Sequence, residues 1–216
     1  MRFVNPLLDA PTIAVVAVGE ADGARGVAAA LACAGADLDA PALFIDMGGR
    51  PARPALLTST AAQKLEERLV AHLPELKPAA RGQVCHLAVP AAPDGVDAAS
   101  AAVSVARGAC AVLYLPPSML QPVLAPESGV GLTGVLLRAD LAAERALVAL
   151  AVRDLFAREL AVAVLKHRLG WVSERRALFG ALPAGSPGGL PPRLVRRLGL
   201  VSRDKEIPVP VQAAAS

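Results

Sequence analysis

Short apolar runs alternate with amphipathic or alanine-rich segments along most of this chain. The runs are nearly continuous rather than alternating, as expected for strands of a parallel sheet that is covered on both faces. The pattern predicts six strands, at about residues 13–18, 42–46, 83–89, 109–115, 131–137 and 160–165. The intervening segments predict five helices, at about residues 24–34, 61–73, 94–106, 118–124 and 141–158.

Two of these helices carry clear local signals. Thr60 and Gln63 have the spacing of a capping box at the start of the second helix. Asp140 is a candidate N-cap for the longest helix. Helical periodicity assigns these leucines and one valine to buried faces: Leu65, Leu69, Val70 and Leu73 in the second helix, and Leu147, Leu150 and Leu155 in the longest.

Strand and helix alternation predicts a three-layer α/β/α sandwich with a mainly parallel sheet of about six strands. We expect one α/β domain over residues 1–202, with its core at 12–165 and basic C-terminal helices at 166–202. Residues 203–216, rich in proline and alanine, are expected to form a flexible tail.

Composition bears on location and redox state. Hydrophobic residues make up 54% of the chain, yet the most apolar window, Leu141–Leu165, is interrupted by six charged residues. No uninterrupted stretch reaches the roughly 18–20 apolar residues of a membrane span, and no signal-peptide pattern opens the chain. Cys33, Cys85 and Cys110 form no C-x-x-C pair and are expected to be reduced thiols. We therefore expect a cytoplasmic protein without a transmembrane segment.

Positive charge gathers toward the C-terminus. Nine Lys or Arg residues stand between positions 166 and 205, against two acidic residues. These charges either form the solvated faces of two helices or bind an anionic partner through Arg175, Arg176, Arg193, Arg196 and Arg197. Sequence-specific nucleic-acid binding is not expected, because the chain has no aromatic-rich sheet and no recognition-helix motif.

The stretch from Thr12 to Leu31 has the strand, glycine turn and helix that open many nucleotide-binding α/β proteins. With Gly19 as the first glycine, its spacing fits the phosphate loop G-x-x-x-x-G-K-[ST]. The last three motif positions then hold Ala24, Arg25 and Gly26. An arginine can contact phosphate with a different shape from lysine, but Gly26 has no hydroxyl for Mg²⁺.

The order of elements resembles the ParA/MinD-type branch of P-loop ATPases. The likeness rests on the stretch above and on three later strands: Ala42–Asp46, Cys85–Pro90 and Gly134–Arg138. In that family the second strand ends in an Asp near the metal and the attacking water, here Asp46. The resemblance implies a P-loop-NTPase-like sheet in a cytosolic protein that dimerises over ATP and positions other machinery.

Several positions depart from the family pattern. Arg25 replaces the lysine, Gly26 replaces the hydroxyl, and Ala88 stands where the third strand usually carries a metal-supporting Asp. Glu20 and Asp22 place two negative charges inside the loop that would embrace an anion. Asp22 could itself occupy a phosphate position at the helix N-terminus. Together these departures favour a degenerate relative that does not hydrolyse nucleotides.

Asp46 and Arg25 each have a functional and a structural interpretation. Asp46 could act on metal or water, or it could cap the turn at residues 47–50 or pair with an arginine. Arg25 could contact phosphate, or form an ion pair with Glu20 or Asp22. If the chain does bind ATP and Mg²⁺, the binding residues are Gly19, Gly23, Arg25, Gly26 and Asp46.

Other chemistries are not indicated. His72, His86 and His167 lack metal-ligand spacing, and Cys85 and His86 should point to opposite faces of their strand. There is no G-x-S-x-G elbow and no G-x-G-x-x-G fingerprint. Three hypotheses remain. The favoured one is a non-catalytic scaffold or regulator that associates with a protein partner or a second copy, without catalytic residues, cofactor or metal. The others are a nucleotide-binding switch with an altered loop, and a peripheral module using the basic C-terminal helices.

Overall fold

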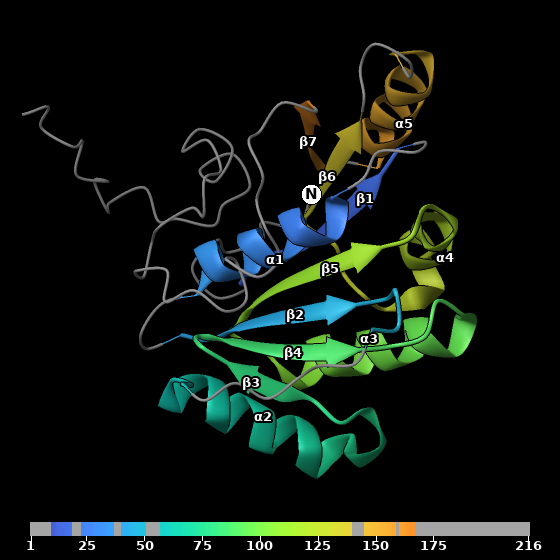
Figure 1. The fold of residues 1–216 in the computed structure, drawn as a ribbon. Coiled ribbons are helices and arrows are strands. Elements are labelled where there is room, and N and C mark those ends of the chain that lie inside the picture. Colours follow the sequence, from blue (N-terminus) through green and yellow to red (C-terminus); the bar gives the residue numbers. More distant parts are fainter. Residues whose placement is uncertain are drawn as a thin grey trace, which may run out of the picture.

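A seven-stranded sheet forms the centre of the protein (Figure 1). The computed structural model describes residues 10–18, 23–36, 40–50, 57–139, 145–158 and 160–166. The strand order is β3-β4-β2-β5-β1-β6-β7, and all neighbours are parallel except β3, which is antiparallel to β4. The strands are β1 (Thr12–Ala17), β2 (Ala42–Asp46), β3 (Ala79–Arg81), β4 (Val84–Ala88), β5 (Cys110–Leu115), β6 (Gly134–Ala139) and β7 (Ala161–Lys166).

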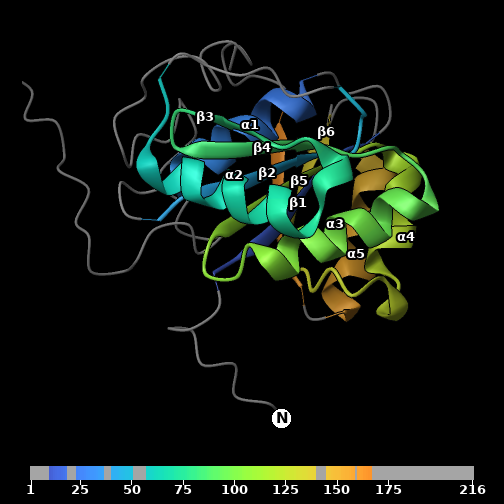
Figure 2. The same ribbon diagram turned by 90° about the horizontal axis from the view of Figure 1, so that it is seen from below.

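Helices cover both faces of this sheet (Figure 2). On one face the described helix is α1, and on the other face lie α2, α3, α4 and α5. The helices are α1 (Ala24–Gly35), α2 (Thr60–His72), α3 (Pro93–Val105), α4 (Leu120–Leu124) and α5 (Arg145–Ala157), with 3-10 turns at Pro74–Leu76, Pro117–Met119 and Pro126–Ser128. The predicted α/β sandwich is therefore confirmed.

Strand alternation divides the core into two halves. Successive side chains of a strand point to opposite faces, so Ile13 and Val15 face α1 whereas Ala14 and Val16 face the other helices. Strands β1, β2, β4 and β5 are buried on both faces, which explains why their sequences are continuous apolar runs. Leu65 and Leu69 of α2 and Leu155 of α5 pack into the second half, as predicted.

Small side chains bring α1 close to the sheet. Residues 27–32 of this helix, four of them alanines, are all buried against β1, β2 and β5. Gly23 is the N-cap residue, with a left-handed φ of 84° that favours glycine. Helix α1 therefore begins directly after Gly23.

Some sequence predictions were wrong. The short edge strand β3 was not predicted, because three residues carry too little pattern to distinguish a strand from a loop. The N-cap of α2 is Ser59, whose side chain accepts a hydrogen bond from the Ala62 N–H, and not Thr60. Val70 and Leu150 were assigned to buried faces but are 46% and 56% exposed.

The connections reverse direction at β1 and β5. From β1 the chain passes through α1 over β5 to β2, whereas from β5 it passes through α4 over β1 to β6. The carboxyl ends of β1 and β5 therefore form a topological switch point, the place where open α/β sheets bind ligands.

No described helix is both long and apolar enough to cross a bilayer. Asp140 and residues 167–216 lie outside the described residues. The predictions for an N-cap, basic helices and a tail at these positions therefore stay predictions.

Candidate functional site at the carboxyl edge of the sheet

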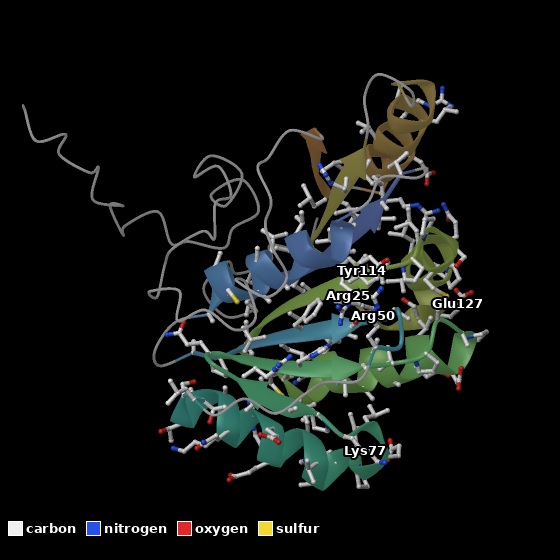
Figure 3. The ribbon with its side chains drawn as sticks, viewed as in Figure 1. Arg25, Arg50, Lys77, Tyr114 and Glu127 are labelled. Carbon is white, nitrogen blue, oxygen red and sulfur yellow. The ribbon has the colours of Figure 1, made fainter. Side chains whose placement is uncertain are left out.

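Four strands each direct a polar side chain toward the α1 face of the sheet. Each of these side chains follows, two positions later in the same strand, a buried apolar residue that faces α1. The pairs are Phe44 and Asp46, Val84 and His86, Val112 and Tyr114, and Leu136 and Arg138. Arg25 joins them from the first turn of α1. Figure 3 shows Arg25, Tyr114 and Arg50 gathered near the carboxyl ends of β2 and β5. The polar residues thus meet beside the switch point.

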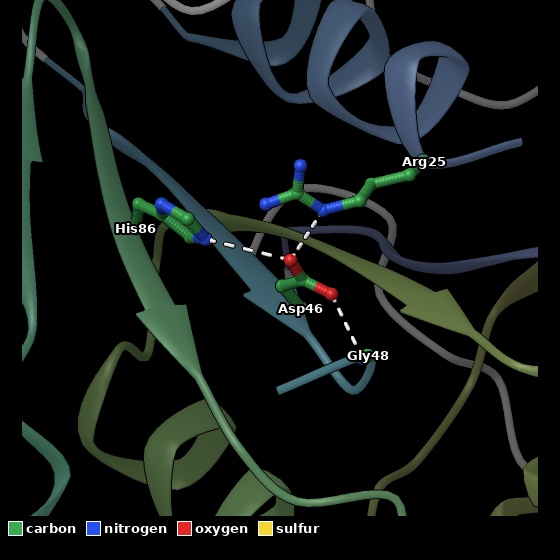
Figure 4. Close-up of polar contacts among 4 residues, drawn as sticks. All are labelled: Arg25, Asp46, Gly48 and His86. Carbon is green, nitrogen blue, oxygen red and sulfur yellow. Dashed lines mark hydrogen bonds and ion pairs between the residues drawn. The ribbon is translucent and has the colours of Figure 1, made fainter. Parts of the chain in front are cut away.

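Asp46 is the centre of this group. Its side chain is fully buried, and both of its oxygens have donors. The Arg25 Nε–H donates a short hydrogen bond to Oδ2 and forms an ion pair with the carboxylate (Figure 4). The Gly48 N–H donates to Oδ1 at 2.8 Å. Asp46 therefore caps the following turn and neutralises an arginine at the same time.

Gly48 fits this turn because a side chain would collide with its neighbours. A Cβ atom at this position would lie 2.9 Å from Asp46 Oδ1 and 3.1 Å from Tyr114 Cε1. The turn therefore packs its backbone directly against the carboxylate and the tyrosine ring. This close approach lets the Gly48 N–H reach Asp46.

His86 lies on the other side of the carboxylate. It pairs with Phe44 in the register of β2 and β4, and the two rings stack with centroids 4.9 Å apart. His86 Nε2 is 4.0 Å from Asp46 Oδ2, too far for a hydrogen bond. Burial, followed by the charges of Arg25 and Arg81, lowers the pKa of His86 to about 4. The ring is therefore neutral at pH 7, and its contact with Asp46 is not an ion pair there.

Arg138 brings a second guanidinium to the switch point. Arg138 pairs with Ala17 at the end of β1, and the Arg138 carbonyl accepts a hydrogen bond from the Val18 N–H at 2.7 Å. Its Nη2 atom is 4.0 Å from the place where a Cβ of Gly23 would stand. Arg138 is thus buried beside the N-terminus of α1.

The described side chains fit neither a metal centre nor a reactive cysteine. Among the described residues, no three His, Cys, Asp or Glu side chains lie close enough together to hold a metal ion. Ala88 stands beside Asp46 in the register of β2 and β4 and has no carboxylate to offer. Burial raises the pKa values of Cys33, Cys85 and Cys110 to about 12, so their thiolates are not available at neutral pH.

Four of the five residues assigned to the hypothetical nucleotide site lie in the described part of the chain. Gly23, Arg25 and Asp46 lie at the carboxyl edge of the sheet. Gly26 is buried within α1. Gly19 lies outside the described residues, as do Glu20 and Asp22, the predicted partners of Arg25.

Sequence reasoning missed the roles of His86, Tyr114 and Arg138. The available signal was strand alternation. Each of these residues is the polar member of an i, i+2 series whose earlier members face α1. What the sequence does not reveal is the strand order, and without it these positions cannot be placed next to Asp46.

A separate open groove, with a volume of about 440 Å³, lies at the opposite edge of the sheet. Leu132 and Leu160, just before β6 and β7, line it together with Val123, Leu124 and Arg158. The Arg158 guanidinium there donates to the Leu124 carbonyl at 3.2 Å. This groove does not include the residues around Asp46.

Comparison with known proteins gave no match to a protein family, to a curated protein or to a solved structure.

Proposed function

We propose that this chain is a non-catalytic relative of ParA/MinD-type ATPases that acts as a scaffold or regulator through association with a protein partner or a second copy of itself. The observation that carries the proposal is the Arg25–Asp46 pair. The arginine at the lysine position of the phosphate loop and the acid at the metal position bind each other.

The state of Asp46 supports this proposal. An acid that assists Mg²⁺ or positions water needs an oxygen open to the ligand. Asp46 is 0% exposed, and its oxygens already accept from Arg25 and from the Gly48 N–H. Releasing it would leave an uncompensated charge in the core, which is costly.

The neighbouring positions support the same conclusion. Ala88, beside Asp46 on β4, supplies no second carboxylate, and Gly26 in the first turns of α1 supplies no hydroxyl. Among the described residues, the sheet edge where a ligand would bind thus lacks this hydroxyl and this second carboxylate. Such a protein transmits its effect through its surface and its partners rather than through turnover.

The alternative, a nucleotide-binding switch with an altered phosphate loop, has one observation in its favour. Arg25 and Arg138 both lie near the N-terminus of α1 at the switch point, where the helix dipole also favours anions. In this alternative, Arg25 exchanges Asp46 for phosphate. The basic C-terminal module is a third possibility that concerns residues outside the described part.

A paired assay tests the proposal. The purified full chain is incubated with ATP or GTP and Mg²⁺, and hydrolysis is measured beside sedimentation velocity with and without nucleotide. We expect no hydrolysis above the buffer rate, and a self-association or partner association that nucleotide does not change. Hydrolysis that is abolished by Arg25→Ala, or association that requires nucleotide, would support the alternative.

A further inference from the structure

Two basic side chains, the charged Arg25 and the neutral His86, approach one oxygen of Asp46 from different elements. Arg25 reaches Oδ2 from α1, and the His86 Nε2 atom faces the same oxygen from β4 at 4.0 Å (Figure 4). Arg25 holds the oxygen, and the imidazole stands just beyond hydrogen-bond distance. Arg25 and His86 therefore compete for the same acceptor, Asp46 Oδ2.

His86 is an unusual buried polar group. It is 1% exposed, and neither Nδ1 nor Nε2 has a hydrogen-bond partner among the described residues. The large majority of buried polar atoms in native proteins have a hydrogen-bond partner, so such an exception requires an explanation. Stacking on Phe44 fixes the ring plane but satisfies neither nitrogen. An imidazole that only filled space could be replaced by an apolar side chain.

Burial first, and then the charges around His86, keep its ring neutral. Arg25 from α1 and Arg81 from β3 disfavour the imidazolium, while Asp46 from β2 is the acid that faces it. Glu66 from α2 acts on Cys85, whose side chain packs on the opposite face of β4. Because Arg25 already neutralises Asp46, a proton added to His86 would gain little attraction from this carboxylate.

We propose that His86 is the reserve partner of Asp46: when Arg25 leaves the carboxylate, the imidazole takes up a proton from solvent and replaces it. The exchange needs a movement of only about 1 Å to bring Nε2 into hydrogen-bond range of Oδ2. The proton binds to a ring nitrogen and no other bond changes. The buried carboxylate then keeps a cationic neighbour throughout.

This arrangement makes the N-terminus of α1 releasable. Without a reserve partner, withdrawing Arg25 would isolate a buried negative charge. When His86 carries a proton, which requires acidic pH, Arg25 can turn toward another anionic group at the switch point, and its release is coupled to uptake of one proton. The inference concerns the exchange itself and does not depend on the family assignment or on the proposed function.

Proton NMR titration of the full chain tests the exchange. The ring Cε1–H signal of His86 is assigned by its loss in His86→Gln, which separates it from His72 and His167. In the wild type we expect it to titrate near pH 4. In Arg25→Gln we expect the titration to move up by roughly 1.5 pH units or more, because an opposing charge is gone and a carboxylate is freed. Arg50→Gln, which removes an exposed arginine near the same edge, should leave it unmoved.

Three outcomes would overturn the proposal. One is a His86 titration in Arg25→Gln at the wild-type pH. Another is a proton on the Asp46 carboxyl, seen in its carbon shift, while His86 stays neutral. The last is an equal rise in Arg50→Gln, which would show a general charge effect.

Thermal unfolding keeps the test decisive if Arg25→Gln is poorly folded at pH 7.5. Its Tm deficit relative to wild type should shrink as the pH falls to 5.5, because His86 then supplies the missing cation. In the double variant Arg25→Gln/His86→Gln the deficit should persist. A deficit that shrinks equally in both variants, or in neither, would overturn the proposal.

Discussion

Arg25 and Asp46 join the N-terminus of α1 to the carboxyl end of β2 through a buried ion pair. The aspartate is fully enclosed, whereas the arginine side chain remains 12% exposed. This difference means that the two members of the pair are not equivalent. Losing the arginine isolates a charge in the core, while losing the aspartate frees a group that can still reach water.

The first prediction follows from that asymmetry. At pH 7.5, Arg25→Ala should lower the free energy of unfolding by about 3–5 kcal/mol, the range for a broken buried pair. Asp46→Asn should cost less, because the amide can still accept from Gly48 and Arg25 can turn to solvent. Urea denaturation measures both. The exposed pair Asp154–Arg158 provides a control, since Asp154→Asn should cost below about 1 kcal/mol. Equal costs at all three positions would contradict the interpretation.

His86 predicts how stability depends on pH. Its pKa is lowered to about 4 in the folded chain, against 6.5 for the ordinary side chain, so the unfolded state binds more protons between these values. The folded chain therefore has its full stability, as far as His86 is concerned, above pH 6.5. The free energy of unfolding then decreases as the pH falls from 6.5 toward 4, because protonation of His86 favours the unfolded state. The full effect is on the order of 3 kcal/mol.

Two histidine variants check this pH dependence by urea denaturation between pH 7.5 and 4.5. His86→Gln should remove the part of the acid-induced loss that belongs to His86. His72→Gln should keep it, because His72 is exposed at the end of α2, where its Nδ1 contacts the Arg68 carbonyl. If both variants retain the wild-type slope, His86 is not the group that titrates.

Gly48 predicts a steric effect. Gly48→Ala should destabilise the fold by about 1–3 kcal/mol, because the added methyl group meets Asp46 Oδ1 and Tyr114. Gly82→Ala is the matched control. Gly82 has a φ of 59° but no atom within 4 Å of an added Cβ, so only backbone strain of about 1 kcal/mol is expected. A Gly48→Ala variant as stable as wild type would show that the turn can move away from the carboxylate.

The N-cap of α2 predicts a contrast between adjacent residues. Ser59→Ala should cost about 1 kcal/mol, since it removes the acceptor for the Ala62 N–H. Thr60→Ala should be nearly neutral, because Thr60 is exposed in the first turn and alanine is the better helix former. Thermal unfolding of the two variants decides between the residues, and the opposite order would restore Thr60 as the cap.

Ser59 and Thr60 also show why the sequence predicted the positions of helices and strands better than the residue that caps a helix. Serine and threonine at positions 59 and 60 are both good caps, and only the backbone path decides which one is used. Similarly, alternation in β2 and β4 could assign Asp46 and His86 to a face. It could not place them side by side, because that requires the strand order and register.

Tertiary packing also decided which helix positions are buried. The periodicity of α2 places Val70 beside Leu69, yet only Leu69 lies against the sheet, and Val70 is 46% exposed. A helix at the margin of a sheet buries a narrower stripe than its apolar pattern suggests. The central strands, buried on both faces, left no such ambiguity and were predicted correctly.

The nucleotide response of the full chain tests the central claim most directly. Thermal unfolding is measured with ATP, ADP, GTP and GDP at millimolar concentration, each with Mg²⁺, for the wild type and for Arg25→Ala. We predict no change in Tm, because Arg25 and Asp46 are already bound to each other. A rise in the wild-type Tm with one nucleotide, lost in Arg25→Ala, would contradict the account and establish a nucleotide site at the switch point.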